Sequence, residues 1–166
     1  MEIQDGLIET AANIKLLALD CDGVLTDGRL YLGRNGEELK VFHVHDGYGI
    51  VKWKNAGLLS AVITARESPM VSSRAEELGI DHVVQNAKDK ASELLNICRV
   101  EGIDASECAY VGDDNADLAA FEVAGLPIAV ANAVPEVLAA ASLVTSKSGG
   151  AGAVREVVEA LLASRN

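Results

Sequence analysis

Short apolar runs alternate with helix-like stretches along almost the whole chain, and this alternation limits the possible folds more than any other feature. The runs predict strands at 14–20, 59–64, 81–84, 108–112, 126–130 and 142–145. The stretches between them predict helices at 47–57, 68–79, 88–102, 115–124, 134–141 and 151–164. Strands that alternate with helices favour a parallel sheet covered on both faces. We therefore expect an α/β protein with a doubly wound parallel sheet.

The segment between the first strand and the first helix breaks this alternation. In RLYLGRNGEELKVFHVHDG, two strand-like runs flank Asn35-Gly36, a dipeptide that is typical of tight β-hairpins. Residues 29–46 are therefore predicted to form a β-hairpin flap, which could reach over the end of the sheet. The length of 166 residues suits a single domain over 1–166.

Composition excludes several classes of partner. The net charge of −11 argues against nucleic acid and against anionic membranes, because both require clustered Lys and Arg. No apolar run approaches the length of a transmembrane helix. The three cysteines lack metal-ligand spacing and sit among apolar neighbours, which favours reduced thiols and a cytoplasmic location. A small anionic substrate remains possible if basic residues gather locally.

Two aspartates directly follow the first apolar run, in LLALDCDGV. Taken alone, this D-x-D-G pattern is more often a turn, because Asp and Gly favour turns. However, open α/β sheets bind ligands beyond the carboxyl ends of their strands. There, one of Asp20 and Asp22 would be a carboxylate nucleophile that forms an acyl phosphate, and the other would exchange a proton with the leaving group.

Further polar residues follow the next two strands. Thr64 ends the second run, and Lys88 and Lys90 come after the third. A β-branched residue is ordinary in a strand, and most lysines are solvated. At a phosphate site, however, Thr64 would donate a hydrogen bond to a phosphoryl oxygen. One of the two lysines would stabilise both the nucleophile and the transferring group.

A second acidic cluster follows the run at 108–112, in the pattern G-D-D-x-x-D. Acidic residues commonly cap the first turn of a helix, and Asp114 could do only that. Asp20, Asp22 and Asp113 at neighbouring strand ends would repel one another unless a cation lay between them. An all-oxygen ligand set beside a phosphate indicates Mg²⁺.

This ordered set of motifs resembles the haloacid dehalogenase superfamily of aspartate-nucleophile phosphatases, from about Ile14 to the C-terminus. The resemblance is strongest to the short, capless group that contains 3-deoxy-D-manno-octulosonate 8-phosphate (KDO 8-phosphate) phosphatase. It is carried by DCDGVLTDGRLYLGRNGEELKVFHVHDGYGI, ITAR, LGIDHVVQNAKDK, YVGDDNADL and GGAGAVREV. The resemblance implies a Rossmann-like sheet without a cap domain, Mg²⁺ as cofactor and a homotetramer. In such a tetramer, the hairpins and C-terminal segments of neighbours help to enclose each site.

The resemblance also implies a role for each catalytic residue. Asp20 is expected to be the nucleophile and Asp22 the general acid and base. Thr64 is expected to contact the phosphate. Lys90, rather than Lys88, matches the motif lysine by its spacing after LGIDH.

The same resemblance implies the metal ligands. They are the carboxylates of Asp20 and Asp113 and the backbone carbonyl of Asp22. Asp114 and Asp117 are expected to support these ligands from behind or through water.

Residues for the sugar are implied in the same way. Besides Asp22 and Lys90, the residues expected to bind substrate are His43, His45, Asp46, Gly47, Arg66 and Arg74. This chain departs from the group where relatives usually carry a basic residue, at His45, Val51 and Ala151, and it has ITAR where they have ITGR. The departures weaken the assignment of the sugar more than the assignment of the phosphatase reaction.

The leading hypothesis is therefore a Mg²⁺-dependent phosphomonoesterase that acts on a small acidic sugar phosphate, with KDO 8-phosphate first. A nonulosonate 9-phosphate or a broader set of sugar phosphates is the alternative. A receiver-like phospho-acceptor would use similar residues, but it places them in a different order. A non-catalytic oligomerisation module would not need the motif residues.

Overall fold

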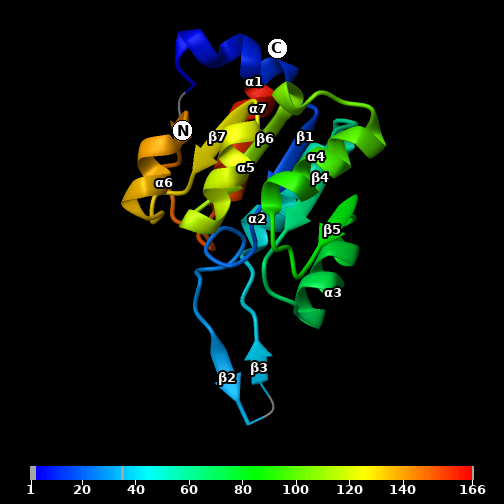
Figure 1. The fold of residues 1–166 in the computed structure, drawn as a ribbon, viewed down its shortest axis with the longest axis vertical. Coiled ribbons are helices and arrows are strands. Elements are labelled where there is room, and N and C mark those ends of the chain that lie inside the picture. Colours follow the sequence, from blue (N-terminus) through cyan, green and yellow to red (C-terminus); the bar gives the residue numbers. More distant parts are fainter. Residues whose placement is uncertain (1–2, 35, 166) are drawn as a thin grey trace.

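The computed structural model describes residues 3–34 and 36–165, and its centre is a parallel sheet of six strands in the order β5-β4-β1-β6-β7-β8 (Figure 1). The strands are β1 (Leu16–Leu19), β4 (Leu59–Ile63), β5 (His82–Val84), β6 (Cys108–Gly112), β7 (Leu126–Ala129) and β8 (Leu143–Val144). From β1 the chain first builds β4 and β5 on one side, then returns to β6, β7 and β8 on the other. The strand order thus reverses beside β1, which is where open α/β sheets bind their ligands.

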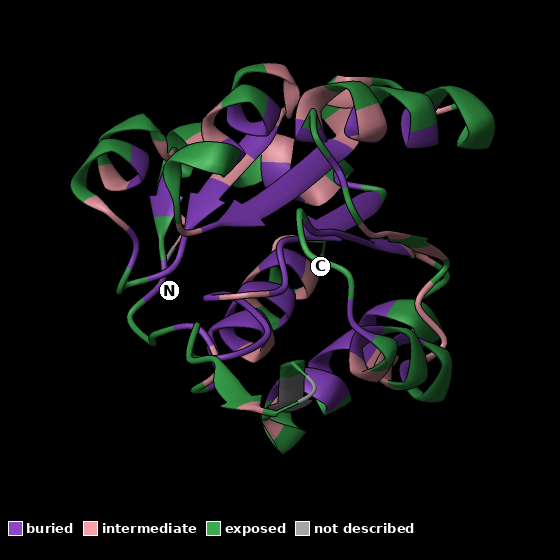
Figure 2. Ribbon diagram, turned by 60° about the horizontal axis from the view of Figure 1, so that its bottom comes forward, coloured by how far each residue is buried: buried purple, intermediate pink, exposed green. Residues whose placement is uncertain are grey.

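Helices cover both faces of the sheet, as predicted. The helices are α1 (Ile8–Asn13), α2 (Val44–Asn55), α3 (Pro69–Leu78), α4 (Lys90–Glu101), α5 (Leu118–Val123), α6 (Pro135–Ala140) and α7 (Ala153–Ala163). The chain also forms short 3₁₀ turns: η1 (Asp5–Leu7), η2 (Ala105–Glu107) and η3 (Asn115–Asp117). α2 packs against α7 in one layer, and α4, α5 and α6 make contacts in the other. Figure 2 shows the buried strands between these layers.

The core consists of aliphatic residues from the sheet and from the inner faces of the helices. All residues of β1 and β6 are buried, because helices cover both faces of these central strands. Trp53 of α2 is fully buried and donates from Nε1 to the carbonyl of Leu59 at 2.7 Å. No described helix has the length and apolar character needed to span a bilayer.

Two of the predicted helices differ most from the structure. α2 begins at Val44 rather than at residue 47, because His43 acts as its N-cap and accepts a hydrogen bond from the amide of His45. The predicted helix at 115–124 is split into η3 and α5. Gly79 and Gly102 end α3 and α4 in the left-handed conformation, which accounts for glycine at both positions.

The predicted hairpin is confirmed, but it does not cover the sheet. Strands β2 (Tyr31–Gly33) and β3 (Gly36–Leu39) pair in antiparallel fashion, and Asn35 of the predicted turn lies outside the described residues. The hairpin projects away from the rest of the molecule beyond the carboxyl end of the sheet (Figure 1). Only its base reaches the end of the sheet in this chain.

Candidate active site

A cleft of about 290 Å³ opens at the carboxyl ends of β1, β4 and β6. The predicted residues that line it are Asp20, Asp22, Thr64, Arg66, Lys90, Asp113 and Asp114. They come from separate segments of the chain, and the sheet brings them together because its parallel strands end at one edge. The aspartate pair, Thr64, Lys90 and the second acidic cluster thus meet in space, as their positions after successive strands predicted.

The loop after β1 holds Asp20 at the floor of the cleft. The amide of Asp20 donates to the carbonyl of Val111 at 3.0 Å, which extends the β1–β6 pairing by one residue. Its Oδ1 accepts from the amide of Cys21 at 2.7 Å and lies 2.9 Å from Nζ of Lys90. The Asp20 carboxylate is buried, so these two donors replace water and fix its orientation.

Lys90 is fixed in turn by Asp117. Its Nζ donates to Oδ1 of Asp117 at 2.7 Å, and the hydroxyl of Tyr110 donates to the same oxygen at 2.9 Å. The amides of Asp113 and Asp114 donate to Oδ2 at 2.9 and 3.2 Å. Because both oxygens of Asp117 are engaged in this way, Asp117 is suited to supporting the site from behind rather than to binding a ligand.

Asp113 approaches the D-x-D-G loop closely. Gly23 has a φ of +96°, and a Cβ at this position would overlap the Asp113 carboxylate. Glycine is therefore required there for its conformation and for the space that it leaves. Oδ1 of Asp113 is buried and has no hydrogen-bond partner among the described residues.

The electrostatics of the cleft favour a bound cation. Burial and the charge of Asp117 raise the pKa of Asp20 to about 6, although Lys90 opposes the shift. Burial and the charge of Asp20 raise the pKa of Asp113 to about 7. Burial alone would lower the pKa of Lys90, but the charges of Asp20 and Asp117 outweigh it and raise that pKa. Clustered carboxylates with raised pKa values are stabilised when a positive ion binds between them.

The residues present fit a divalent metal. Carboxylate oxygens of Asp20, Asp113 and Asp117 lie within 4.8 Å of one another. Asp117 is already engaged by Lys90 and Tyr110, which leaves Asp20 and Asp113 as the carboxylates of this trio able to bind a metal. The unpartnered Oδ1 of Asp113 supplies one available oxygen. An all-oxygen set of this kind suits Mg²⁺.

Asp22 lies beside two cations, and one of them was missed from the sequence. Lys40, at the base of the hairpin, forms an ion pair with Oδ1 of Asp22, and the Lys40 side chain is only 2% exposed. Nε of Arg66 lies 3.6 Å from Oδ2 of the same carboxylate. Lys40 is eighteen positions from Asp22 and does not follow a strand of the parallel sheet, so the pattern of polar residues at strand ends did not point to it.

Thr64 is placed as predicted, at the end of β4. It is buried, its amide donates to the carbonyl of Val84 at 2.9 Å, and its own carbonyl accepts from the amide of Ala87 at 3.0 Å. Its Oγ1 accepts weakly from the amide of Arg66 at 3.4 Å. The hydroxyl proton therefore remains available to donate toward a ligand in the cleft.

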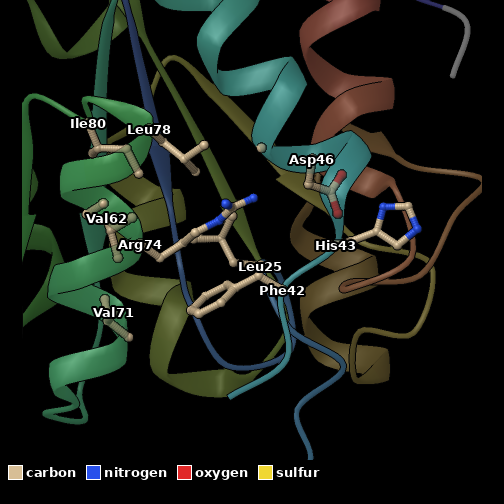
Figure 3. Close-up of a pocket in the computed structure, with 11 residues that line it drawn as sticks. Leu25, Phe42, His43, Asp46, Val62, Val71, Arg74, Leu78 and Ile80 are labelled. Carbon is tan, nitrogen blue, oxygen red and sulfur yellow. The ribbon is translucent and has the colours of Figure 1, made fainter. Parts of the chain in front are cut away.

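Arg74, His43, Asp46 and Gly47 lie elsewhere, around a narrow crevice between α3 and the start of α2 (Figure 3). Arg74 extends into this crevice, with its guanidinium 6.0 Å from the centre of the Phe42 ring and 2.7 Å from the Glu77 carboxylate. The free volume is about 10 Å³, roughly one water molecule. The crevice is therefore too small for a sugar in this conformation.

Asp46 has a clear structural task. It is buried, and its two carboxylate oxygens accept from the amides of Gly152 and Arg155 at 3.1 and 2.8 Å. These bonds cap α7 and fasten it to α2. Burial raises the pKa of Asp46, and the two amide bonds partly oppose that rise. The structure does not bring this carboxylate to the cleft.

The remaining predicted or variant positions lie outside the cleft or at its rim. His45 is exposed on the first turn of α2, Val51 packs against the core, and Ala151 is exposed before α7. Asp114 caps η3 by accepting from the amide of Asn115. Among the described residues, the cations at the cleft are Lys40, Lys90 and Arg66, rather than side chains at the three variant positions.

Comparison with known proteins yields one consistent family. A family model described as haloacid dehalogenase-like hydrolase matches residues 80–157. The curated 3-deoxy-D-manno-octulosonate 8-phosphate phosphatase of Escherichia coli K12 is 45% identical over 156 residues, which cover 94% of this chain and 83% of the relative. The enzyme of that name from Yersinia pestis is 41% identical over 164 residues, covering 99% and 88%.

Solved structures agree with the sequence relatives. The phosphatase of the same name from Moraxella catarrhalis, in complex with a magnesium ion, a phosphate ion and a KDO molecule, superposes with a TM-score of 0.95. It is 43% identical, over 99% of this chain and 94% of that chain. A cobalt-bound homologue from Haemophilus influenzae has a TM-score of 0.92 and 39% identity, over 94% and 91%.

Proposed function

The chain belongs to the haloacid dehalogenase-like hydrolases and, within them, to the family of 3-deoxy-D-manno-octulosonate 8-phosphate phosphatases; from this premise we propose that it hydrolyses KDO 8-phosphate with Mg²⁺ and an aspartyl-phosphate intermediate. One observation supports the chemistry above all others. Asp20 is buried and oriented by Lys90, and it lies at the switch point of the sheet beside the unpartnered oxygen of Asp113.

In the first step, the Asp20 carboxylate attacks the phosphorus of the ester. The bond between phosphorus and the sugar oxygen breaks, and Asp22 gives its proton to the departing alkoxide. Lys90 holds Asp20 in place and balances negative charge at the phosphoryl group, while the Thr64 hydroxyl donates to a phosphoryl oxygen. Asp20 then carries the phosphoryl group.

In the second step, water attacks the phosphorus of aspartyl-phosphate. Asp22, now a carboxylate, accepts a proton from that water, the acyl–phosphate bond breaks, and inorganic phosphate leaves with Asp20 restored. Asp20, Asp113 and the backbone carbonyl of Asp22 are the groups that would hold Mg²⁺. When bound, Mg²⁺ supplies positive charge that neutralises the carboxylates and the substrate phosphate.

Substrate recognition is assigned in part. Arg66 lines the cleft and is suited to an anionic group of the sugar. His43, His45, Asp46, Gly47 and Arg74 would reach a sugar only if α2 and α3 moved apart or if a neighbouring subunit used them. These roles remain proposals, as does the role of the chain as a single catalytic domain over 1–166.

We also propose a homotetramer in the cytoplasm. The projecting hairpin carries apolar side chains that a lone chain leaves exposed, including Leu32 at 67% and Leu39 at 58%. Contacts between such hairpins would bury them, as the family resemblance implies. Free thiols at Cys21, Cys98 and Cys108 suit a reducing compartment.

A phosphate-release panel tests the substrate. The purified protein with Mg²⁺ is given KDO 8-phosphate, nonulosonate 9-phosphates and hexose phosphates, and kcat/KM is compared. We expect KDO 8-phosphate to be preferred at least roughly tenfold, the value of one well-placed contact. Preference for a nonulosonate would replace the substrate assignment, and a flat profile would indicate a generalist phosphatase.

The nucleophile is tested separately. Asp20→Asn removes the attacking carboxylate at nearly constant volume, so hydrolysis of every substrate should fall to the background rate. Asp89→Asn, at the exposed N-cap of α4, is the matched control and should retain activity. Equal activity of Asp20→Asn and the parent protein would contradict the proposed mechanism.

A further inference from the structure

The Lys40 side chain is buried although it lies at the base of a hairpin whose described side chains are mostly exposed. It follows β3 at the point where the hairpin returns to the sheet, and its side chain is 2% exposed. Leu39 and Val41, its neighbours in sequence, are 58% and 55% exposed. A buried ammonium group is unfavourable unless it is paired with an anion, and Oδ1 of Asp22 forms such a pair with Lys40. The hairpin therefore has an ionic anchor in the catalytic loop.

The anchor makes the two oxygens of Asp22 different. Oδ1 is held by Lys40, whereas Oδ2 is buried and accepts no hydrogen bond from the described residues. Oδ2 lies on the side of Arg66, which lines the cleft, with 3.6 Å between Oδ2 and Nε. A carboxyl group can transfer a proton efficiently only if one oxygen is held at the reacting atom.

We propose that Lys40 is the positioning residue for Asp22: it donates to Oδ1 both when Oδ2 is ionised and when Oδ2 carries the proton, and so holds the carboxyl group with Oδ2 facing the leaving oxygen of the substrate. The inference rests on the proton-transfer role of Asp22 given under the proposed function. It also makes the base of the hairpin part of the catalytic apparatus. Displacement of the hairpin would move Lys40 and release the Asp22 side chain.

Leaving-group dependence distinguishes this role from a structural one. A sugar alkoxide needs a proton to leave, whereas p-nitrophenolate is a weak base that leaves without one. In Lys40→Met, kcat/KM, which covers only the steps up to departure of the leaving group, should fall at least roughly tenfold for the sugar phosphate and less than about threefold for p-nitrophenyl phosphate. Lys40→Arg keeps the cation and should restore sugar-phosphate turnover to within about threefold of the parent.

The controls separate this proposal from the one on which it rests. Lys52→Met removes an exposed lysine of α2 and should change neither rate. Asp22→Asn should show the same selective loss as Lys40→Met, only larger. One pair of results would overturn the role of Lys40 alone. In that case Asp22→Asn loses activity selectively on the sugar phosphate, whereas Lys40→Met loses activity equally on both substrates or loses none. Equal losses of kcat/KM for the two substrates in Asp22→Asn would instead overturn the role of Asp22 as proton donor to the leaving group.

Circular dichroism and urea denaturation show whether each variant is folded. If Lys40→Met does not fold, Lys40→Gln provides the same test, because its amide can still donate one neutral hydrogen bond to Oδ1. In Lys40→Gln, the selective loss of activity on the sugar phosphate should be larger than in Lys40→Arg and smaller than in Asp22→Asn. Turnover of both substrates at the parent rate in Lys40→Gln would overturn the proposal.

Discussion

At the scale of single residues, Gly23 sets how closely the catalytic loop approaches Asp113. In Gly23→Ala, the new Cβ would occupy the position of the Asp113 carboxylate, at a φ of +96° that disfavours alanine. We expect kcat to fall roughly 100-fold or more, because an ångström of misplacement has that effect, and the free energy of unfolding to fall by about 1–3 kcal/mol. Steady-state kinetics and urea denaturation measure the two effects.

Gly57→Ala is the matched control for Gly23→Ala. Gly57 also has a positive φ, +77°, but a Cβ added there would meet no atom within 4 Å. It should therefore lose stability from backbone strain and retain its kcat. If both variants lost activity equally, displacement of Asp113 would not be the cause.

Tyr110 is predicted to act on Lys90 through Asp117. Burial and the charge of Asp117 raise the pKa of Tyr110 far above its ordinary value, so it stays a neutral donor. In Tyr110→Phe, Oδ1 of Asp117 loses the tyrosine hydroxyl and keeps Lys90 as its side-chain donor. The Lys90 ammonium group is then expected to shift toward Asp117 and away from Asp20. We expect kcat to fall by about three- to tenfold with KM unchanged, and a stability loss of about 1 kcal/mol. A raised KM with an unchanged kcat would argue against this coupling, and Tyr48→Phe on the exposed face of α2 is the control.

The residues that could be predicted from the sequence are those that belong to motifs. Asp20, Thr64, Lys90 and Asp113 each follow a strand, so the direction of the parallel strands alone places them together. Lys40 could not be found in this way, because its position depends on how the hairpin returns to the sheet. Partners that meet through tertiary packing leave no local signal in the sequence.

At the scale of elements, α4 and β6 meet at two thiols. Sγ of Cys98 and Sγ of Cys108 lie 3.2 Å apart, and both residues are buried. Burial raises the pKa of Cys98, and burial together with the Cys98 thiol raises the pKa of Cys108 strongly. The contact joins the helix that begins with Lys90 to the strand that precedes Asp113.

The raised thiol pKa values predict alkaline destabilisation. Above about pH 8.5 the unfolded chain releases thiol protons that the folded chain retains, so the free energy of unfolding falls as pH rises, by up to about 1.4 kcal/mol per pH unit for each thiol. Below that pH the thiols contribute no slope. Urea denaturation between pH 7 and 10 with a reducing agent should show a shallower fall for Cys108→Ala. Identical slopes in the two proteins would contradict the prediction.

Element boundaries were predictable where a local cap decides them. Pro69 and Gly79 bracket α3 close to the predicted limits of 68–79. The start of α2 was placed too late, because its cap is a histidine side chain, which is an uncommon N-cap. The short helix α1 was not predicted, since six residues are too few for a periodic signal.

At the scale of the whole molecule, the order of strands explains why one cleft serves all motifs. β1 lies between β4 and β6, so the loops that follow these three strands diverge from a single switch point. Alternation of strands and helices predicted the parallel sheet, but not the neighbours of each strand. Those neighbours depend on which helix covers which face, and that is settled by packing between distant segments.

The projecting hairpin predicts how the whole molecule assembles. Leu32 is 67% exposed and lies one pair from the turn of the hairpin, so a contact between hairpins would bury it. In Leu32→Glu, a charge would have to be desolvated in that contact, and the proposed tetramer should dissociate. Sedimentation velocity should show a smaller species, while circular dichroism stays unchanged because the hairpin lies outside the core.

Leu95→Glu is the control for this assembly. Leu95 is 44% exposed on α4, on a different element, and its substitution should leave the tetramer intact. Since only the base of the hairpin reaches the cleft, dissociated Leu32→Glu should keep Lys40 on Asp22 and retain turnover of p-nitrophenyl phosphate. A sedimentation coefficient equal to that of the parent protein in Leu32→Glu, or dissociation in Leu95→Glu, would place the subunit interface elsewhere.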